Sequence, residues 1–466
     1  MKLLKKVKRI HFIGIGGIGM SGIAELLINL GYEVSGCDLK RSAITERLES
    51  LGAKIEYSHN KNHINGIDVV VYSSAVSDKN PELIEARKKA IPVIPRAEML
   101  AELMRFKYGI AVSGAHGKTT TTCMIASILS AAEMDPTVII GGRLSIWDGS
   151  NARLGQGDIL VAEADESDGT FLRLSSVISV VTNIDYEHMD YYKSMENLRN
   201  SFVEFINKLP FYGLAVLCLD DEQIRKIIPR VKRRYITYGL ETDADIKGHF
   251  LKREDFGTRF ELVYKGKNLG EVFVGMPGIH NVLNALAAVG VAMELEIGMD
   301  SIIKGLRNIG GLERRFQIKG ETKEILVMDD YGHHPTEIVA TLKTIKEWWP
   351  HKRLIVAFQP HRYSRTKALF DKFVTSFDYA DVLILNPIYP ASEPPIEGIT
   401  SKRLARAIKE HGHKNVIYST GLDETLSILM EIAKPGDMIL TLGAGNIYLV
   451  GERFLQKKKN EKNPAT

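Results

Sequence analysis

Cysteine is scarce in this chain: Cys37, Cys123 and Cys218 are the only three among 466 residues. They lie far apart, with the spacing of neither a metal-ligand pair nor a redox pair. The sequence therefore excludes a disulfide-stabilised scaffold, which needs several paired cysteines. We expect the protein to work in a reducing compartment, the cytoplasm.

A strong charge of one sign is also absent. The formal net charge of +4 is small for a chain of this length. A global electrostatic attraction to DNA or RNA is therefore not indicated, and we expect no nucleic-acid partner.

Long apolar runs are missing as well, with one apparent exception. The basic stretch MKLLKKVKR precedes a mostly apolar segment, residues 10–30, which mimics a signal peptide. Five glycines between Gly14 and Gly22, followed by Glu25 and Asn29, fit a strand, a turn and a helix better. No other segment approaches the length of a membrane span, so we expect no membrane partner.

The most informative feature that is present is a glycine-rich turn between an apolar strand and an amphipathic helix. Its residues are Gly114, Ala115, His116, Gly117, Lys118, Thr119 and Thr120. Backbone N–H groups and the dipole at a helix N-terminus favour phosphate oxygens. Lys118 would neutralise the β- and γ-phosphates, and the Thr119 hydroxyl would ligate Mg²⁺. The turn therefore predicts a site for a nucleoside triphosphate.

This loop departs from the usual phosphate-loop pattern, which requires glycine where Val112 stands. It is a shortened variant. An ordinary strand-to-helix turn with a solvated lysine is the alternative interpretation.

The rest of the chain alternates apolar strands with helical patterns, which predicts parallel sheets. With 44% hydrophobic residues, the length suits about three domains. We place them at residues 1–106, 107–313 and 314–466, and expect the tail at 457–466 to be disordered. The predicted strands are 10–15, 33–37, 69–72, 108–112, 159–162, 177–181, 325–328, 354–358, 382–385, 416–418 and 438–442.

The predicted fold class is α/β with three domains. The N-terminal and C-terminal domains are Rossmann-like, and the central one is a P-loop-type ATPase domain with a parallel sheet plus antiparallel strands. The antiparallel strands are expected in a hairpin, where Thr258–Tyr264 and Gly270–Val274 flank a turn at 265–268.

A second glycine turn, Gly14–Gly19, matches the dinucleotide fingerprint. Asp38 ends the next predicted strand, where a ribose-binding acid is expected. Glycines here indicate that the backbone closely approaches something, typically a diphosphate. An NAD-dependent dehydrogenase is therefore an alternative function, and a tight packing turn is the alternative structural interpretation.

Two acidic loops follow strands of the central region, Glu163–Asp168 and Asn183–Asp190. Mg²⁺ takes oxygen ligands and shares them with substrate phosphates, so acids at strand ends beside a phosphate loop suit it. Each loop by itself is equally consistent with a solvated acidic surface.

Further polar residues follow predicted strands or open helices. Asn281 and Asn284 share one helix face and could hydrogen-bond an adenine or a ribose, although Asn281 also fits a helix cap. Arg362 and Arg365 follow a buried strand and suit bidentate capture of a carboxylate. Surface arginines, and a structural role for the histidine pair at 333–334, are the alternatives.

In this order the motifs resemble those of the Mur ligases of peptidoglycan synthesis, in particular the branch that adds alanine. The resemblance covers the chain up to its basic tail. It rests on GIGGIGMSG at 14–22, GAHGKTTTT at 114–122, EADESD at 163–168, EHMD at 187–190, HNVLNA at 280–285, RRF at 314–316, DDYGHHP at 329–335 and FQPHRYSRT at 358–366.

The resemblance implies a UDP-substrate-binding domain, an ATP-binding domain and an amino-acid-binding domain, in chain order. It implies that Lys118, Glu166 and His188 are catalytic, and that Mg²⁺, or Mn²⁺ in its place, is held by Thr119, Glu166 and His188. The implied ATP contacts are Gly114, Ala115, His116, Gly117, Lys118, Thr119, Thr120, Asn281, Asn284, Arg315 or its neighbour Arg314, and Asp330. The implied UDP-substrate contacts are Gly16, Gly17, Gly19, Asp38, Ser73 and Ser74. The implied amino-acid contacts are His333, Arg362 and Arg365.

The implied activity is ATP-dependent ligation of L-alanine to the lactoyl carboxylate of UDP-N-acetylmuramate through an acyl phosphate, by a monomer or weak homodimer. A recycling ligase that joins a tripeptide to the same UDP-sugar is the nearest alternative. A dehydrogenase leaves the phosphate loop and both acidic loops unexplained. A non-catalytic UDP-sugar sensor would dispense with Lys118, Glu166 and His188.

Two positions depart from the family pattern. Ala115 stands where threonine is usual, which should matter little because backbone N–H groups bind phosphate there. Ser392 stands in a loop where the family has alanine and glycine, which leaves the role of residues 389–395 open. Some relatives carry a carbamylated lysine that supports a metal, and no lysine here is assigned to that role.

Overall fold

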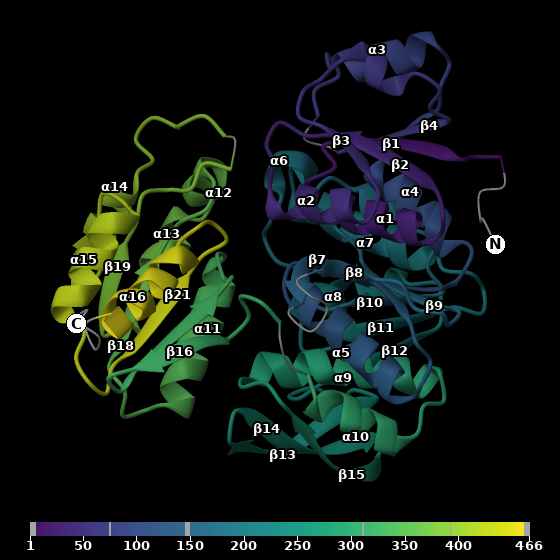
Figure 1. Ribbon diagram of the computed structural model, residues 1–466. Helices are drawn as coiled ribbons and strands as arrows, with labels where there is room; N and C mark the ends of the chain where they lie inside the picture. The colour runs from purple at the N-terminus through teal and green to yellow at the C-terminus, as the bar shows by residue number, and fades with distance from the viewer. Residues whose placement is uncertain (1–5, 74–75, 145–149, 310–311, 392, 461–466) are drawn as a thin grey trace. The chain divides into compact units, whose positions relative to one another are not determined.

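The computed structural model describes residues 6–73, 76–144, 150–309, 312–391 and 393–460 (Figure 1). The chain divides into two compact units, Met1–Gly275 with His280–Gly311, and Met276–Ile279 with Leu312–Thr466. The first unit contains two sheets, and the second contains one. The predicted α/β class with three sheet-based parts is confirmed.

The N-terminal sheet has five parallel strands in the order β3-β2-β1-β4-β5. Strands β2 and β3 lie on one side of β1, and β4 and β5 lie on the other. The carboxyl ends of β1 and β4 therefore form a switch point, where such sheets bind ligands. The elements are β1 Arg9–Ile13, α1 Ile18–Asn29, β2 Glu33–Cys37, α2 Ala43–Ser50, β3 Lys54–Glu56, η1 Lys61–Ile64, β4 Val69–Tyr72, α3 Pro81–Lys88, β5 Val93–Pro95 and α4 Arg96–Met104.

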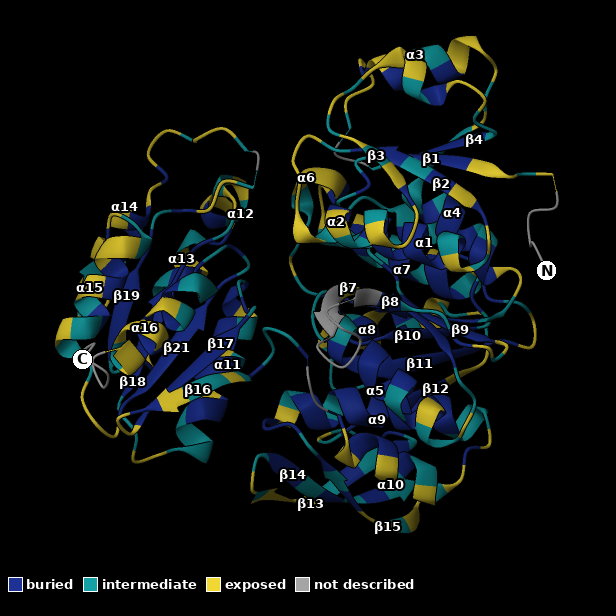
Figure 2. Ribbon diagram, viewed as in Figure 1, coloured by how far each residue is buried: buried dark blue, intermediate teal, exposed yellow. Residues whose placement is uncertain are grey.

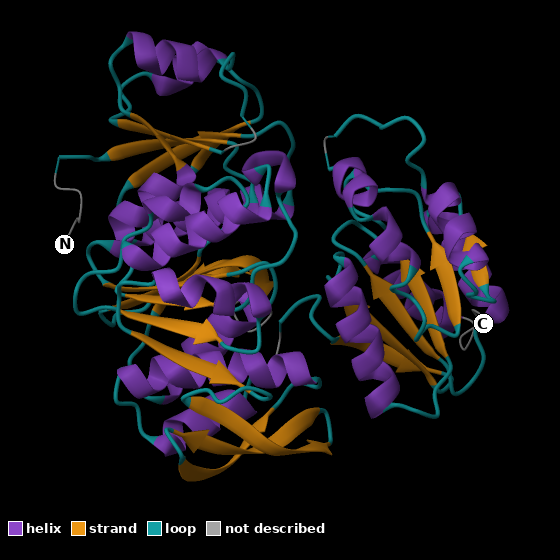
Figure 3. Cartoon of the chain, turned by 180° about the vertical axis from the view of Figure 1, so that it is seen from behind, coloured by secondary structure: helices purple, strands orange, loops and turns teal. Residues whose placement is uncertain are grey.

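The central sheet has ten strands in the order β15-β14-β13-β12-β11-β10-β6-β9-β7-β8. Its middle strands are parallel and almost wholly buried, and helices cover both faces (Figures 2 and 3). Its elements are β6 Tyr108–Ser113, α5 Lys118–Ala131, β7 Thr137–Leu144, β8 Ser150–Arg153, β9 Ile159–Glu163, η3 Thr170–Arg173, β10 Ile178–Val181, α6 Met189–Tyr192, α7 Met195–Asn207, β11 Leu214–Cys218, α8 Glu222–Ile227, η4 Ile228–Arg230, β12 Tyr235–Gly239, β13 Ile246–Glu254, β14 Gly257–Tyr264, β15 Lys267–Val274, α9 Ile279–Glu294 and α10 Met299–Arg307.

The C-terminal sheet has the order β16-β17-β21-β18-β19-β20, with β16 as an antiparallel edge on five parallel strands. One apolar core of β17, β18, β19, β21 and the last two helices holds this sheet. Its elements are β16 Gln317–Thr322, β17 Ile325–Asp330, α11 Pro335–Trp348, β18 Leu354–Phe358, α12 Tyr363–Ala368, α13 Phe370–Val374, β19 Val382–Leu385, α14 Ser401–Glu410, β20 Val416–Tyr418, α15 Leu422–Ile432, β21 Met438–Leu442 and α16 Tyr448–Asn460.

Two local expectations need correction. The hairpin turn is shorter than predicted, because Tyr264 pairs with Lys267 and leaves only Lys265 and Gly266 between the strands, both with positive φ. Helix α16 continues to Asn460, four residues into the segment expected to be disordered.

This longer helix has a physical reason. Its buried Phe454 and Leu455 anchor it, and basic residues suit a helix C-terminus. Residues 461–466 lie outside the described part of the chain. Among the described helices, none combines the length and apolar character that a membrane crossing requires.

Candidate active site

The predicted phosphate loop lies between β6 and α5. Gly114 and Gly117 have φ values of +131° and +82°, a conformation that residues with a Cβ rarely adopt. A Cβ on Gly114 would stand 2.2 Å from Thr182 Oγ1, and one on Gly117 would stand 2.4 Å from Asn284 Oδ1. Backbone conformation and lack of space therefore both require glycine here.

The end of β10 fixes the backbone of this loop. The His116 N–H donates to Asn183 Oδ1 at 2.9 Å, and the His116 carbonyl accepts from Thr182 Oγ1 at 2.6 Å. His116 Nε2 lies 3.1 Å from Asp185 Oδ2. The first turn of α5 contains no acidic residue. Its N–H groups therefore form a preorganised site for an anion.

Lys118, the first residue of α5, forms an ion pair with Glu166. Its Nζ lies 3.0 and 3.1 Å from the two carboxylate oxygens and also donates to the Gly114 carbonyl. Burial by itself lowers the pKa of Lys118, but the Glu166 carboxylate outweighs this effect and raises the pKa. Burial raises the pKa of Glu166, and Lys118 opposes that shift. Lys118 is therefore held as a cation beside the loop.

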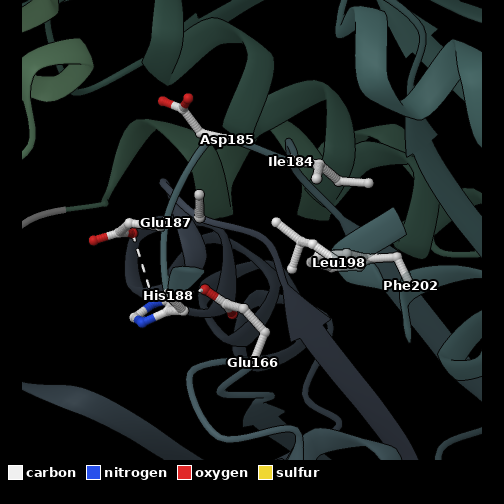
Figure 4. A pocket seen from close by; sticks show the side chains of 8 residues that line it. Glu166, Ile184, Asp185, Glu187, His188, Leu198 and Phe202 are labelled. Carbon is white, nitrogen blue, oxygen red and sulfur yellow. Dashed lines mark ion pairs between the residues drawn. The ribbon is translucent and has the colours of Figure 1, made fainter. Parts of the chain in front are cut away.

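His188 and Glu187 complete a cluster around Glu166. His188 Nε2 lies 3.7 Å from Glu166 Oε1 and 3.7 Å from Glu187 Oε2. Figure 4 shows the imidazole between the two carboxylates. The pocket contains about 170 Å³ of empty space, part of it open to solvent. Its apolar lining is Ala115, Ile184, Leu198 and Phe202.

This cluster fits a divalent cation. One donor atom from each of Glu166, Glu187 and His188 lies within 4.8 Å of the others, and Mg²⁺ prefers such oxygen-rich sites. His188 has a φ of +57°, and uncommon backbone conformations are typical of functional sites. Thr119, the third predicted ligand, occupies the second position of α5 and is half-buried.

The two predicted adenosine-binding asparagines lie on α9 and are buried. Asn284 donates through Nδ2 to Asn281 Oδ1 at 3.2 Å and accepts from Thr121 Oγ1 at 3.2 Å. The pair therefore joins α9 to α5 behind the phosphate loop. Contact of either residue with adenosine stays a prediction.

The Gly14–Gly19 turn follows β1, and Asp38 shapes it. Asp38 Oδ2 accepts from the Gly16 N–H at 2.9 Å, and a Cβ on Gly16 would stand 2.8 Å from the same oxygen. Gly17 is the N-cap of α1. Ser73 donates its N–H to the Ile13 carbonyl at 3.3 Å, whereas Ser74 lies outside the described residues.

Arg96 is a residue of this region that the sequence did not single out. It begins α4, and a Cβ on Gly19 would stand 2.3 Å from its Nη1. Its Nη2 lies 3.5 Å from Asp165 Oδ2. Burial by itself raises the pKa of Asp165, but Lys118 and Arg96 outweigh this effect and lower the pKa. An arginine beside a glycine turn suits a diphosphate.

In the second unit, Asp330 ends β17 and is 3% exposed. Its carboxylate accepts the N–H groups of Phe316 and Gly332 at 2.9 and 2.8 Å. Burial raises its pKa to about 6, although Arg315 opposes the shift. Arg315 also lies 3.7 Å from Glu337. Asp330 thus organises the turn after β17, and its contact with adenosine stays a prediction.

Arg314, the neighbour of Arg315, supports the same end of the sheet. Its Nε donates to Asp329 Oδ2 at 2.9 Å, and its guanidinium lies 4.7 Å from the centre of the Tyr448 ring. These contacts give Arg314 a structural role.

The residues predicted to bind the amino acid gather around His361. The rings of His333 and His361 are 5.8 Å apart, and Arg365 Nη1 lies 3.3 Å from His361 Nδ1. The His361 ring stacks on Tyr389 at 5.5 Å. Burial, followed by Arg365 and Arg362, lowers the pKa of His361 to about 4, so this imidazole is neutral at pH 7.

Sequence reasoning missed His361 as a site residue. Its only signal was its place between a buried strand and two arginines. Arg362 differs from Arg365: it has a φ of +71° at the N-cap of α12 and lies 3.9 Å from Glu393 Oε1.

A phosphate loop with a charge-paired lysine, a carboxylate–histidine cluster and three α/β sheets define an ATP-dependent α/β enzyme. The chain belongs to the Mur ligase family. The family models that match are the Mur ligase family catalytic domain at residues 9–108, the Mur ligase middle domain at 112–292, and the Mur ligase glutamate ligase domain at 314–445.

Similar curated proteins cover nearly the whole chain. A UDP-N-acetylmuramate–L-alanine ligase of Geotalea uraniireducens is 59% identical over 98% of this chain and 99% of its own. One of Geobacter sulfurreducens is 58% identical over 97% and 98%.

Solved structures are similar over the same extent. The UDP-N-acetylmuramate–alanine ligase of Thermotoga maritima has 28% identity and a TM-score of 0.83, over 97% of this chain and 99% of its own. A murein peptide ligase of Psychrobacter arcticus has 24% identity and a TM-score of 0.70, over 97% and 99%. The second likeness supports the fold alone.

Proposed function

We propose that this protein joins L-alanine to the lactoyl carboxylate of UDP-N-acetylmuramate at the expense of ATP, a step in peptidoglycan precursor synthesis. The observation that carries the proposal is the cluster of Lys118, Glu166 and His188 at the phosphate loop, which combines a phosphate-binding cation with metal-type ligands. Similarity to two UDP-N-acetylmuramate–L-alanine ligases over nearly their full length supports the substrates.

The three sheets divide the substrates between them in this proposal. Residues 1–106 bind the UDP moiety at the Gly14–Gly19 turn, with Arg96 beside it. Residues 107–313 bind ATP, and residues 314–466 bind alanine. The reaction uses soluble nucleotides and takes place in the cytoplasm.

Activation comes first, because a carboxylate is a poor electrophile. A lactoyl carboxylate oxygen bonds to the γ-phosphorus of ATP, the bond from that phosphorus to ADP breaks, and an acyl phosphate forms. Lys118 and the N–H groups of Gly114–Gly117 spread the charge of the transferring phosphoryl group. Mg²⁺ bound by Thr119, Glu166 and His188 would supply further charge neutralisation at the phosphates.

Amide formation then needs a correctly placed amine. Arg362 and Arg365 suit the carboxylate of alanine, which leaves its amine to attack the acyl carbon. The amine attacks in its unprotonated form, after its extra proton has gone to solvent. The nitrogen of the tetrahedral intermediate then loses one further proton to solvent, the bond from the acyl carbon to the phosphate oxygen breaks, and inorganic phosphate leaves. The neutral His361 adds no positive charge that would repel a protonated amine on approach.

The test is phosphate release from ATP, Mg²⁺ and UDP-N-acetylmuramate with either L-alanine or the L-alanyl-γ-D-glutamyl-diaminopimelate tripeptide, with product masses recorded. We expect release that depends on alanine, together with the alanyl product. Turnover with the tripeptide alone would make the protein a recycling ligase instead. No turnover with either would overturn the assigned reaction.

A further inference from the structure

A second cluster of metal-type side chains lies in the N-terminal sheet. His11 on β1, Cys37 at the end of β2 and Glu82 in the first turn of α3 each present a donor atom within 4.8 Å of the other two. The three residues are 1%, 0% and 0% exposed. Cys37 packs in one apolar core with Ile13 and Leu83, so the cluster lies where α3 covers the sheet.

Glu82 Oε2 is the common neighbour of the other donors. Cys37 Sγ donates to it at 2.9 Å, and His11 Nε2 lies 3.8 Å from it. A third side chain, His59, has its Nδ1 3.5 Å from Glu82 Oε2 and 3.3 Å from Cys37 Sγ. Ligand atoms around one tetrahedral Zn²⁺ are about 3.3–3.8 Å apart, as its bond lengths of about 2.0–2.3 Å require. The separations of 3.3, 3.5 and 3.8 Å lie in this range, and the Cys37–Glu82 hydrogen bond is shorter. His59 is not in the group whose donors all lie within 4.8 Å of one another, so its ring must move toward His11 to join them.

Two features of the cluster indicate a missing positive charge. His11 Nε2 is buried and has no hydrogen-bond partner among the described residues. Among the described residues, the ion-pair partners of the buried Glu82 carboxylate are all histidines, with no lysine or arginine. A buried anion requires a compensating charge.

Outer contacts orient the donors as they do in metal sites. His11 Nδ1 bonds to Ser35 Oγ at 2.9 Å, which leaves Nε2 facing the cluster. Glu82 Oε1 accepts the Asn60 N–H at 3.0 Å and lies 2.7 Å from His63 Nδ1, which leaves Oε2 for the cluster. Metal-ligating histidines commonly use their second ring nitrogen in this way.

We propose that His11, Cys37, His59 and Glu82 bind one Zn²⁺ ion. Sulfur, nitrogen and carboxylate donors favour Zn²⁺ over Mg²⁺. The site is of the closed, structural kind and joins β1, β2 and α3. Its outer ligand is His59, whose side chain is 26% exposed and offers the entry path. Binding replaces the thiol proton of Cys37, which is released to solvent.

Co²⁺ is the probe that distinguishes this site from the phosphate-loop cluster. Thiolate-bound Co²⁺ shows a sulfur-to-metal charge-transfer band, and the Glu166–His188 cluster contains no cysteine. Full-length protein is treated with a chelator, dialysed, titrated with Co²⁺ and then with Zn²⁺. We expect one Co²⁺ per chain to give the band, and Zn²⁺ to abolish it.

Two variants and a control decide the proposal. Cys37→Ser should lose the band, whereas Cys218→Ser, which changes another buried cysteine, should keep it. His59→Ala removes a partly exposed ring and should weaken Zn²⁺ binding at least about tenfold. The proposal is overturned if wild type gives no band, if Cys37→Ser keeps it, or if His59→Ala binds Zn²⁺ as wild type does.

Discussion

Lys118 Nζ lies 3.0 Å from Glu166 Oε1, so the side chain proposed to hold ATP phosphates is the counter-ion of the side chain proposed to hold Mg²⁺. Each compensates the charge of the other in a site largely removed from water. When ATP and a divalent cation bind, a phosphate can replace Glu166 as the partner of Lys118, and the cation can replace Lys118 as the partner of Glu166. The pair therefore links nucleotide binding to metal binding.

Lys118→Ala removes the cation at the phosphate loop. We expect turnover to fall at least about 1,000-fold, because charge stabilisation of phosphoryl transfer is lost. Binding of UDP-N-acetylmuramate should be unchanged, since its proposed site is in another sheet. Steady-state kinetics and calorimetric titration measure the two effects. A folded variant that no longer binds the UDP-sugar contradicts the division of substrates between sheets.

His188→Ala removes the nitrogen donor of the Glu166 cluster. We expect the Mg²⁺ concentration for half-maximal rate to rise about tenfold or more. Asp190→Asn is the matched control, because this exposed carboxylate lies two positions further along the chain, in α6. Rates measured across a Mg²⁺ titration check the prediction. An unchanged Mg²⁺ requirement in His188→Ala would remove this residue from the proposed metal site.

Gly114→Ala places a Cβ 2.2 Å from Thr182 Oγ1 at a φ of +131°. The loop must shift, and we expect ATP affinity to fall at least about tenfold because its N–H groups no longer converge. Gly266→Ala is the control: its φ is also positive, at +78°, but nothing lies within 4 Å of a Cβ there. Equal ATP affinity in both variants argues against phosphate binding by this loop.

Arg365→Ala tests the proposed alanine site. We expect the KM for L-alanine to rise about tenfold or more, with little change in the KM for ATP, because a charge-assisted contact to the alanine carboxylate is lost. Arg403→Ala, on the outer face of α14, is the control. A rise in the KM for ATP alone would place Arg365 at the nucleotide instead.

His361 makes stability depend on pH. Its pKa in the folded protein is about 4, below the value of about 6.5 for an unfolded histidine. Between these values the unfolded chain binds a proton that the folded chain does not. The free energy of unfolding therefore falls as the pH drops from about 6.5 to 4, by at most about 3 kcal/mol. Denaturant unfolding should show a flatter dependence in His361→Asn, and an equal slope in both proteins contradicts this account.

Strands buried on both faces could be predicted from the sequence. The apolar runs at 354–358, 382–385 and 438–442 coincide with the buried strands β18, β19 and β21, because parallel strands between helices lack a polar face. Strand β8, with the sequence SNAR, could not. A polar edge strand forms because it pairs with a neighbouring strand, and the local pattern of apolar residues does not reveal that pairing.

The candidate site divides in the same way. Lys118 and Glu166 could be predicted, because each follows a buried strand in a motif with its own chemistry. Arg96 and His361 belong to no motif with its own chemistry. They are recognised as site residues only from the side chains that the fold places beside them. His11 and Glu82 lie 71 positions apart in the sequence, with Cys37 between them, and only the packing of α3 on the sheet brings the three together.

The central claim is that ATP activates the lactoyl carboxylate as an acyl phosphate, and oxygen transfer tests it most directly. The enzyme is supplied with UDP-N-acetylmuramate that carries oxygen-18 in that carboxylate, together with unlabelled ATP, Mg²⁺ and L-alanine. The mass of the released phosphate is measured by mass spectrometry. The account predicts one labelled oxygen in each phosphate, because the carboxylate oxygen that attacked phosphorus leaves with it. Unlabelled phosphate alongside the alanyl product would contradict the acyl-phosphate route.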